Sequence, residues 1–205
     1  FVESFKSERS MFKNKTVWII IAVVAVLFFW MQGVYNNMVT RGEEVSAAWS
    51  QVENQYQRRM DLIPNLVNTV KGYASHERET LEGVVQARAE ATQTRIDPSN
   101  LTAESLQAFQ SAQGELSSAL SRLMVVLERY PDLKANQNFQ ELQAQLEGTE
   151  NRIATERKRF NEVARSYNVY IRKFPNNILS GLFGFEAKAY FAAEAGAEKA
   201  PTVEF

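Results

Sequence analysis

An unbroken apolar run near the N-terminus constrains this chain more than any other feature. Residues 17–31 read VWIIIAVVAVLFFWM, and extending the run to residues 16–35 brings in Gln32 and Gly33 as interruptions. A helix of about 20 residues spans the ~30 Å hydrocarbon core of a bilayer. The sequence therefore predicts a transmembrane helix over residues 16–35, with the lipid membrane as a partner. Its anchoring side chains are Trp18, Ile20, Val23, Leu27, Phe29, Trp30 and Tyr35, with the aromatic rings near the ends suited to the membrane interfaces.

Two other interpretations of this run fit less well. A buried core helix is disfavoured because a strip that is apolar on all faces has no place in a small amphipathic bundle. A cleaved signal peptide requires small residues after the apolar core, whereas Phe29, Trp30 and Met31 stand there. We therefore expect an uncleaved signal anchor.

Flanking charge predicts how the anchor is oriented. Lys6, Arg9, Lys13 and Lys15 precede it, and only Arg41 follows within about twenty residues. The positive-inside rule then places the N-terminus in the cytoplasm. We expect a cytoplasmic leader over residues 1–15 and a domain over residues 36–205 that faces the periplasm or the exterior of a bacterial inner (cell) membrane.

Beyond the anchor, apolar residues recur at intervals of three and four, which indicates amphipathic helices. Pro98, Pro131 and Pro175 divide this region, and Pro64 predicts a bend inside the first helix. Short connections favour antiparallel neighbours, so we expect an all-α, elongated up-down-up-down bundle of three long helices and a shorter fourth. The expected helices cover residues 37–93, 101–130, 139–174 and 178–193.

Helix lengths suggest self-association. The helix over residues 101–130 reaches along the first one only from about residue 93 back to Pro64, because both rise about 1.5 Å per residue. An apolar seam nearer the membrane is left without that partner, so either the C-terminal segment or another copy must cover it. An uncovered seam favours a homo-oligomer. The seam residues are Val45, Trp49, Val52 and Tyr56.

Several polar residues occupy core positions. Gln113, Glu156 and Glu77 fall at similar heights in this register, and a buried carboxylate must be paired, hydrogen-bonded or protonated. We interpret them as a polar layer that sets helix register. The alternative is a metal or proton site, but carboxylate-bridged metal bundles need Glu-x-x-His on two helices, and His76 stands directly beside Glu77.

The bend at Pro64 raises a separate question of hydrogen bonding. Proline lacks an N–H, so the carbonyl of Met60 loses its helical partner. We expect Arg59 or the amide of Asn65 to satisfy groups exposed there.

Composition excludes several function classes. With 23 basic and 24 acidic residues the net charge is −1, which gives no reason to expect a nucleic acid partner. There is no cysteine and a single histidine, and no Gly-rich phosphate loop, GxSxG or HExxH motif. We expect no enzyme, no cofactor or metal, and no small-molecule substrate. The alternative is an enzyme or metal protein built on His76, Glu77 and Glu156.

Several short motifs resemble the LemA family. These are RRMDLIPNLV at residues 58–67, VKGY at 70–73, His76-Glu77, ENRIA at 150–154, Tyr167-Asn168, Phe174-Pro175 and PTVEF at 201–205. The resemblance extends from the membrane segment to residue 205. It implies a membrane-anchored protein with an extended antiparallel helical bundle, and it implies no enzymatic activity.

We hypothesise a self-associating, non-enzymatic protein whose bundle is a scaffold or interaction module in the bacterial cell envelope. The alternative is an adaptor or regulator of an envelope-stress or membrane protease system. Such an adaptor would bind a membrane protein through the aromatic C-terminal region. Aromatic residues of that region are Phe174, Phe183, Phe185, Tyr190 and Phe191.

Overall fold

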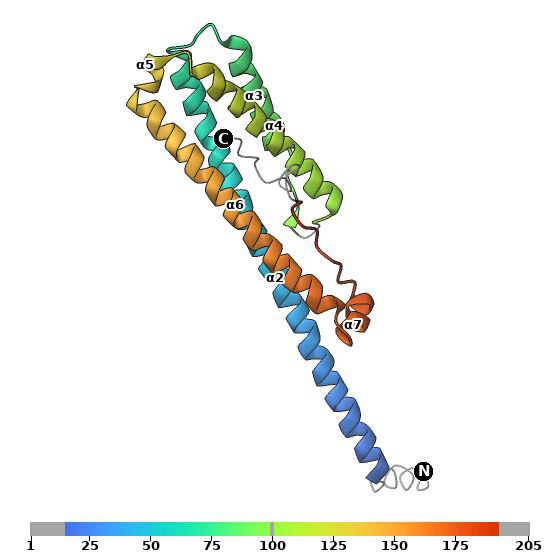
Figure 1. Ribbon diagram of the computed structural model, residues 1–205. Coiled ribbons are helices and arrows are strands. Elements are labelled where there is room, and N and C mark those ends of the chain that lie inside the picture. The colour runs from blue at the N-terminus through green and yellow to red at the C-terminus, as the bar shows by residue number, and fades with distance from the viewer. Residues whose placement is uncertain (1–14, 99–100, 193–205) are drawn as a thin grey trace, which may run out of the picture.

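A computed structural model describes residues 15–98 and 101–192, and the predicted all-α fold is confirmed (Figure 1). The predicted leader over residues 1–15 lies outside the described residues, except for Lys15. The helices are α2 (Lys15–Lys71), α3 (Arg78–Gln93), α4 (Ala103–Leu127), α5 (Pro131–Lys134), α6 (Gln137–Arg172) and α7 (Asn176–Phe183).

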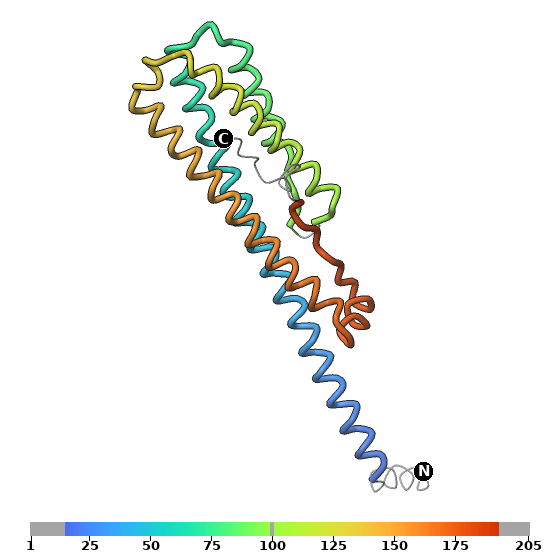
Figure 2. Tube along the Cα trace, viewed as in Figure 1, coloured from blue at the N-terminus to red at the C-terminus, as the bar shows by residue number. Residues whose placement is uncertain are grey.

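The bundle consists of two antiparallel helix pairs side by side (Figures 1 and 2). α2 runs as one 57-residue helix from the N-terminal side to the far end of the molecule, and α6 returns along it. α3 and α4 form the second pair, and α5 turns the chain from α4 into α6. α7 follows α6 and lies against α2 at the end of the bundle nearest the apolar run.

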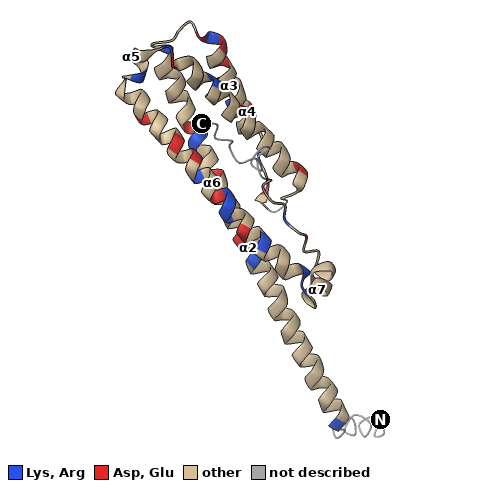
Figure 3. Ribbon diagram, viewed as in Figure 1, with Lys and Arg blue, Asp and Glu red and all other residues tan. Residues whose placement is uncertain are grey.

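The first part of α2 projects beyond the bundle. Its most apolar 18-residue window has a mean hydropathy of 2.4, and 6% of that window is buried. In Figure 3 the ribbon of this stretch is tan, the colour of uncharged residues, beyond the basic residue at its start. All seven predicted anchor residues are exposed, from Trp18 to Tyr35. The chain therefore has an N-terminal helix long and apolar enough to cross a membrane, and it is not a buried core helix.

The first predicted helix is interrupted, which corrects its boundary. α2 ends at Lys71, residues 72–77 form turns, and α3 then folds back instead of continuing to residue 93. The stop is a basic residue in the last turn followed by Gly72, a combination typical of helix C-termini. Ala74 in the turns and Leu81 in α3 are both buried. The hydrophobic periodicity therefore continues through the break, which is why it did not predict the end of α2.

The fourth predicted helix is shorter than residues 178–193. α7 ends at Phe183, and Gly184 caps it in the left-handed conformation with φ 73°. This backbone shape suits glycine, which has no Cβ to clash. Residues 185–192 then continue as an extended segment, which we call the C-terminal strap.

Pro64 is accommodated inside α2, and the donor that compensates for it was not predicted. Helix α2 continues through Pro64, and Arg88 Nε of α3 donates to the Met60 carbonyl at 2.8 Å. Arg59 bonds to other groups, and the Asn65 side chain is exposed. Arg59 therefore does not satisfy the Met60 carbonyl, and the donor to it is Arg88, which the sequence did not predict. The compensating bond also ties α2 to the α3–α4 pair.

A double-mutant cycle tests this compensation. We expect Arg88→Ala to lower the free energy of unfolding by about 1–2 kcal/mol, because it leaves a partly buried carbonyl without a donor. In a Pro64→Ala background an N–H is available to Met60 again, so the same substitution should cost clearly less. Thermal unfolding of the full chain in detergent, followed by circular dichroism, measures both values. Equal costs in the two backgrounds would contradict the assignment.

Candidate functional site

The predicted self-association seam is buried within a single chain. Val45, Trp49 and Val52 are fully buried and Tyr56 is 3% exposed. Trp49 meets the Phe160 ring of α6 at a centroid distance of 5.6 Å and the Phe109 ring of α4 at 5.3 Å. α6 therefore covers the seam, together with α4 and the strap. The seam is not an available surface, and the expectation of a homo-oligomer loses the reason given for it.

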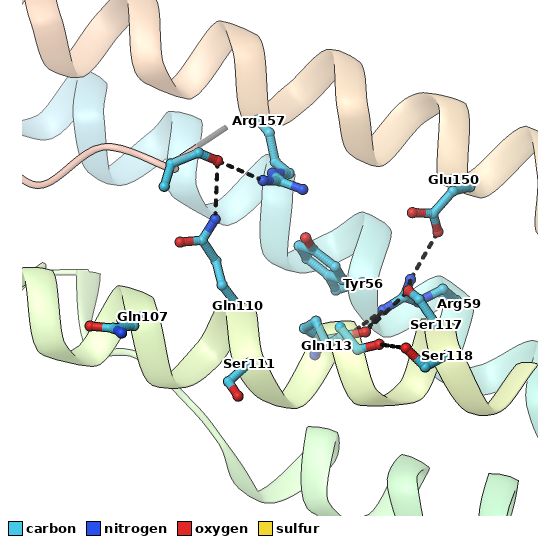
Figure 4. A pocket seen from close by; sticks show the side chains of 12 residues that line it. Tyr56, Arg59, Gln107, Gln110, Ser111, Gln113, Ser117, Ser118, Glu150 and Arg157 are labelled. Carbon is cyan, nitrogen blue, oxygen red and sulfur yellow. Dashed lines mark hydrogen bonds and ion pairs between the residues drawn. The ribbon is translucent and has the colours of Figure 1, made fainter. Parts of the chain in front are cut away.

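A polar layer does exist, and it is centred on Arg59 (Figure 4). The Arg59 side chain is 2% exposed and donates to Gln113 Oε1 of α4 at 2.6 Å. It also donates to Ser117 Oγ at 2.9 Å and to Glu150 Oε2 of α6 at 2.8 Å. Residues from α2, α4 and α6 therefore meet at one level. The layer separates an apolar cluster around Trp49 from a second cluster around Leu66, Leu116 and Leu123.

The layer holds its buried cation with mostly neutral acceptors. The Glu150 side chain is 56% exposed, so the ion pair is solvated on one side and contributes modestly. Gln113 accepts through its side chain and, at 3.3 Å, through its backbone carbonyl. The Tyr56 ring lies 5.2 Å from the guanidinium. Groups from three helices thus replace water around the Arg59 guanidinium, which favours a single register between these helices.

Two residues predicted for this layer lie elsewhere. Glu77 stands in the loop before α3, where it accepts from Tyr130 Oη at 2.8 Å. That hydrogen bond, followed by burial and the carboxylate charge, raises the pKa of the Tyr130 phenol. Glu156 instead approaches Arg159 at 3.8 Å. Glu150 and Ser117 take their places, and periodicity missed them because neither lies on its helix's buried stripe.

The alternative metal or proton site gains no support from these positions. His76 is exposed in the loop between α2 and α3. Within residues 15–98 and 101–192, no three carboxylate or imidazole side chains are grouped so that they could hold a metal ion.

A second feature is the way α6 holds the C-terminal strap. Asn168 Oδ1 accepts from the Lys188 backbone N–H at 2.8 Å, and Asn168 Nδ2 donates to the Lys188 carbonyl at 2.8 Å. Asn161 makes the same pair of bonds with Phe191, at 2.9 Å to its N–H and 3.1 Å to its carbonyl. The two asparagines stand two helical turns apart and bind the strap through its backbone.

The side chain of Phe191 anchors the strap in the aromatic cluster. Its ring stacks on Trp49 at 5.8 Å and meets Phe160 edge-on at 5.5 Å. The Arg157 guanidinium lies 4.8 Å from the same ring. A buried aromatic ring of this kind supplies most of the apolar contact of a short segment. Phe191, which the sequence predicted to lie in a fourth helix, thus helps to cover the seam.

A pocket of about 490 Å³ adjoins the end of the described strap. Ala192 lines it, and the Ala192 carbonyl accepts from Gln110 Nε2 at 3.4 Å and from Arg157 at 3.3 Å (Figure 4). The pocket reaches to Arg59 and Glu150, so the strap and the polar layer belong to one groove. The other residues that line this pocket are Tyr56, Gln107, Ser111, Gln113, Gly114, Ser117 and Ser118. We call the pocket, together with the adjoining strap site formed by Asn161, Asn168 and the rings around Phe191, the α4–α6 groove.

Comparison with known proteins finds one family. The profile of the LemA family matches residues 48–205. Magnetosome protein MamQ 2 of Paramagnetospirillum magneticum is 31% identical over 77% of this chain and 64% of its own length. MamQ of Magnetospirillum gryphiswaldense is 30% identical over the same shares. Protein LemA of Metamycoplasma hominis is 22% identical over 84% of this chain and 75% of its own length. The chain thus spans just under two thirds of the MamQ proteins.

Substitutions in the polar layer should show that its buried and exposed members contribute differently to the free energy of unfolding. We expect Arg59→Leu to lower the free energy of unfolding by about 2–3 kcal/mol, because buried Gln113 loses its donor. Glu150→Gln should cost about 1 kcal/mol or less, because water screens the exposed carboxylate. Arg58→Leu, at an exposed neighbouring position, is the matched control. Chemical denaturation in detergent measures all three, and similar losses for Arg59→Leu and Arg58→Leu would contradict the role of Arg59.

Proposed function

The chain belongs to the LemA family, and from this premise we propose that it is a membrane-anchored, non-enzymatic scaffold of the bacterial cell envelope. Its support is the continuity of α2, which joins the apolar run to the far end of the bundle in one helix. A helix rises about 1.5 Å per residue, so such an anchor holds the domain at a set distance from the bilayer. The bundle then presents its groove to other chains.

The observation that carries this proposal is the backbone-directed hold on the strap. Asn161 and Asn168 each bond to one N–H and one carbonyl of an extended segment, and these groups are present in almost any peptide. Specificity comes from the aromatic site that receives Phe191. A groove of this construction binds extended segments that carry a suitably placed aromatic residue.

Self-association through this groove replaces the seam as our explanation for assembly. Exchange of the strap between two copies would form the same contacts in both, which makes it a low-cost route to a dimer. The strap follows Gly184, whose left-handed conformation reverses the chain after α7. The alternative function is an adaptor that receives a segment of another membrane protein, such as a component of an envelope-stress or protease system.

The proposed orientation follows the flanking charge. The basic residues before the anchor favour an N-terminus in the cytoplasm, which would place the bundle in the periplasm or at the cell exterior.

Peptide binding tests the groove directly. We expect a fluorescent peptide with the sequence of residues 184–192 to bind full-length Phe191→Ala protein in detergent at least tenfold more tightly than wild type. In wild type the chain's own strap competes for the groove, and weakening it frees the site. Fluorescence anisotropy measures the binding. A peptide with alanine in place of Phe191 is the control, and adding Asn161→Ala to the protein should weaken binding again. Failure of the first peptide to bind correctly folded Phe191→Ala protein would contradict the groove's role.

Assembly in mild detergent distinguishes the two forms of the proposal. Native mass spectrometry and affinity purification of the full chain should give a stoichiometric self-assembly if straps exchange between copies. A co-purifying membrane protein lost on Asn161→Ala/Asn168→Ala substitution would instead support the adaptor. A monomer without companion at micromolar concentration would contradict the scaffold.

A further inference from the structure

The outer face of α7 is apolar and exposed. Leu182 is 70% exposed and Ile178 60%, and Phe174 in the preceding turn is 81% exposed. The opposite face is held in the bundle, because Leu179 is buried and Ser180 Oγ donates to the Ile171 carbonyl at 3.0 Å. A helix fixed on one side presents its apolar residues in a defined direction. These exposed residues have no partner within the described part of the chain that would bury them.

The position of α7 along α2 places this apolar face at the end of the membrane anchor. The Phe183 ring contacts Tyr35 edge-on at 5.0 Å, and the Phe185 ring contacts the same tyrosine at 5.6 Å. Tyr35 is the last residue of the predicted span and carries the interfacial type of side chain. α7 is accordingly at the end of the bundle that adjoins the apolar part of α2 (Figure 1).

A basic cleft lies between α2 and the C-terminal part of α6, at the same end of the bundle. Arg41, Arg165 and Lys173 line a pocket of about 330 Å³ together with Glu162, so cations outnumber the carboxylate. Arg41 is held by Ser166 Oγ at 2.9 Å and by the Tyr170 ring at 4.7 Å. It follows Tyr35 by six residues, which corresponds to about 9 Å along the helix. That distance places the backbone of Arg41 near the outer edge of the headgroup layer, from which a long basic side chain can extend to anionic lipid headgroups.

We propose that α7 and Phe174 insert into the headgroup region of the same bilayer that holds α2, and that the basic cleft binds a lipid phosphate. The occupant is the lipid surface, because α7 contacts the end of the apolar run through Tyr35 and the basic cleft lies at the same end of the bundle. This inference rests on the membrane anchoring in the proposed function. A second attachment beside the anchor fixes the orientation of the bundle on the membrane. With a single helix as its only attachment, the bundle would be free to tilt and rotate.

Site-specific fluorescence tests the insertion, and a chain without cysteine suits it. Single substitutions Leu182→Cys, Leu27→Cys and Val125→Cys carry an environment-sensitive label in the full chain, reconstituted in vesicles that contain brominated lipid. Leu27 is in the predicted span, and Val125 is 72% exposed near the α5 end of α4. We expect quenching of at least twofold at positions 27 and 182 and none at position 125.

The controls separate failure of this inference from failure of the anchor. Quenching at position 27 without quenching at position 182 would overturn the insertion of α7 and leave the anchor intact. No quenching at position 27 would overturn the anchor, and the inference with it. Equal quenching at all three positions would show that the bundle lies flat on the membrane, which also contradicts the proposal.

The cleft has its own measurement. Adding phosphatidylglycerol to phosphatidylcholine vesicles should increase quenching at position 182, and Arg165→Gln/Lys173→Gln should remove that increase while quenching at position 27 stays unchanged. Arg122→Gln, an exposed cation on α4, is the matched control. Free inorganic phosphate at millimolar concentration should not compete if the lipid headgroup is the ligand. Identical dependence on phosphatidylglycerol with and without the double substitution would contradict phosphate binding in the cleft.

Discussion

The packing of α6 along α2 is the interaction on which the other features depend. α2 is a very long helix, and burial of its apolar stripe holds a second helix against it. Trp49 is the largest fully buried side chain, and rings from α4, α6 and the strap surround it. Each buried aromatic or aliphatic side chain of this size contributes on the order of 2 kcal/mol. The same packing that closes the seam inside one chain also creates the groove in which the strap lies.

The polar layer adds specificity to this packing. Two apolar clusters stacked along a bundle allow helices to slide, because apolar contacts have little direction. The terminal nitrogens of Arg59 can bond to both Gln113 and Glu150 only where these residues come to the same level, so α2, α4 and α6 are aligned at that height. The bond from Arg88 to the Met60 carbonyl adds α3 to the same arrangement. Register is therefore set by hydrogen bonds within an otherwise apolar interior.

The end of the bundle nearest the apolar run is built differently from the far end. There the chain ends its regular helices, turns at Gly184 and returns as an extended segment bound through its backbone. Backbone pairing with two side-chain amides involves fewer bonds than a helix or a sheet, so a segment held in this way can exchange more readily than the helices around it. α7, which joins this strap to α6, also carries the exposed apolar face. The proposed exchange of the strap and the proposed membrane contact of α7 therefore involve the same region.

The sequence by itself determined the apolar run, the helical periodicity and most helix ends, because these are local properties of consecutive residues. It also identified Gln113 and Arg59 as polar residues with structural roles, since they interrupt apolar stripes. Only the tertiary structure decided which partners they meet. Glu150 lies 91 residues from Arg59 in the sequence, and Arg88 lies 28 residues from Met60. Arg88 is on α3, which runs back along the bundle after the chain turns at Gly72. Periodicity shows which face of a helix is buried, but not what covers it. For that reason the seam could not be assigned to α6 and Phe191, rather than to another copy, before the path of the chain was known.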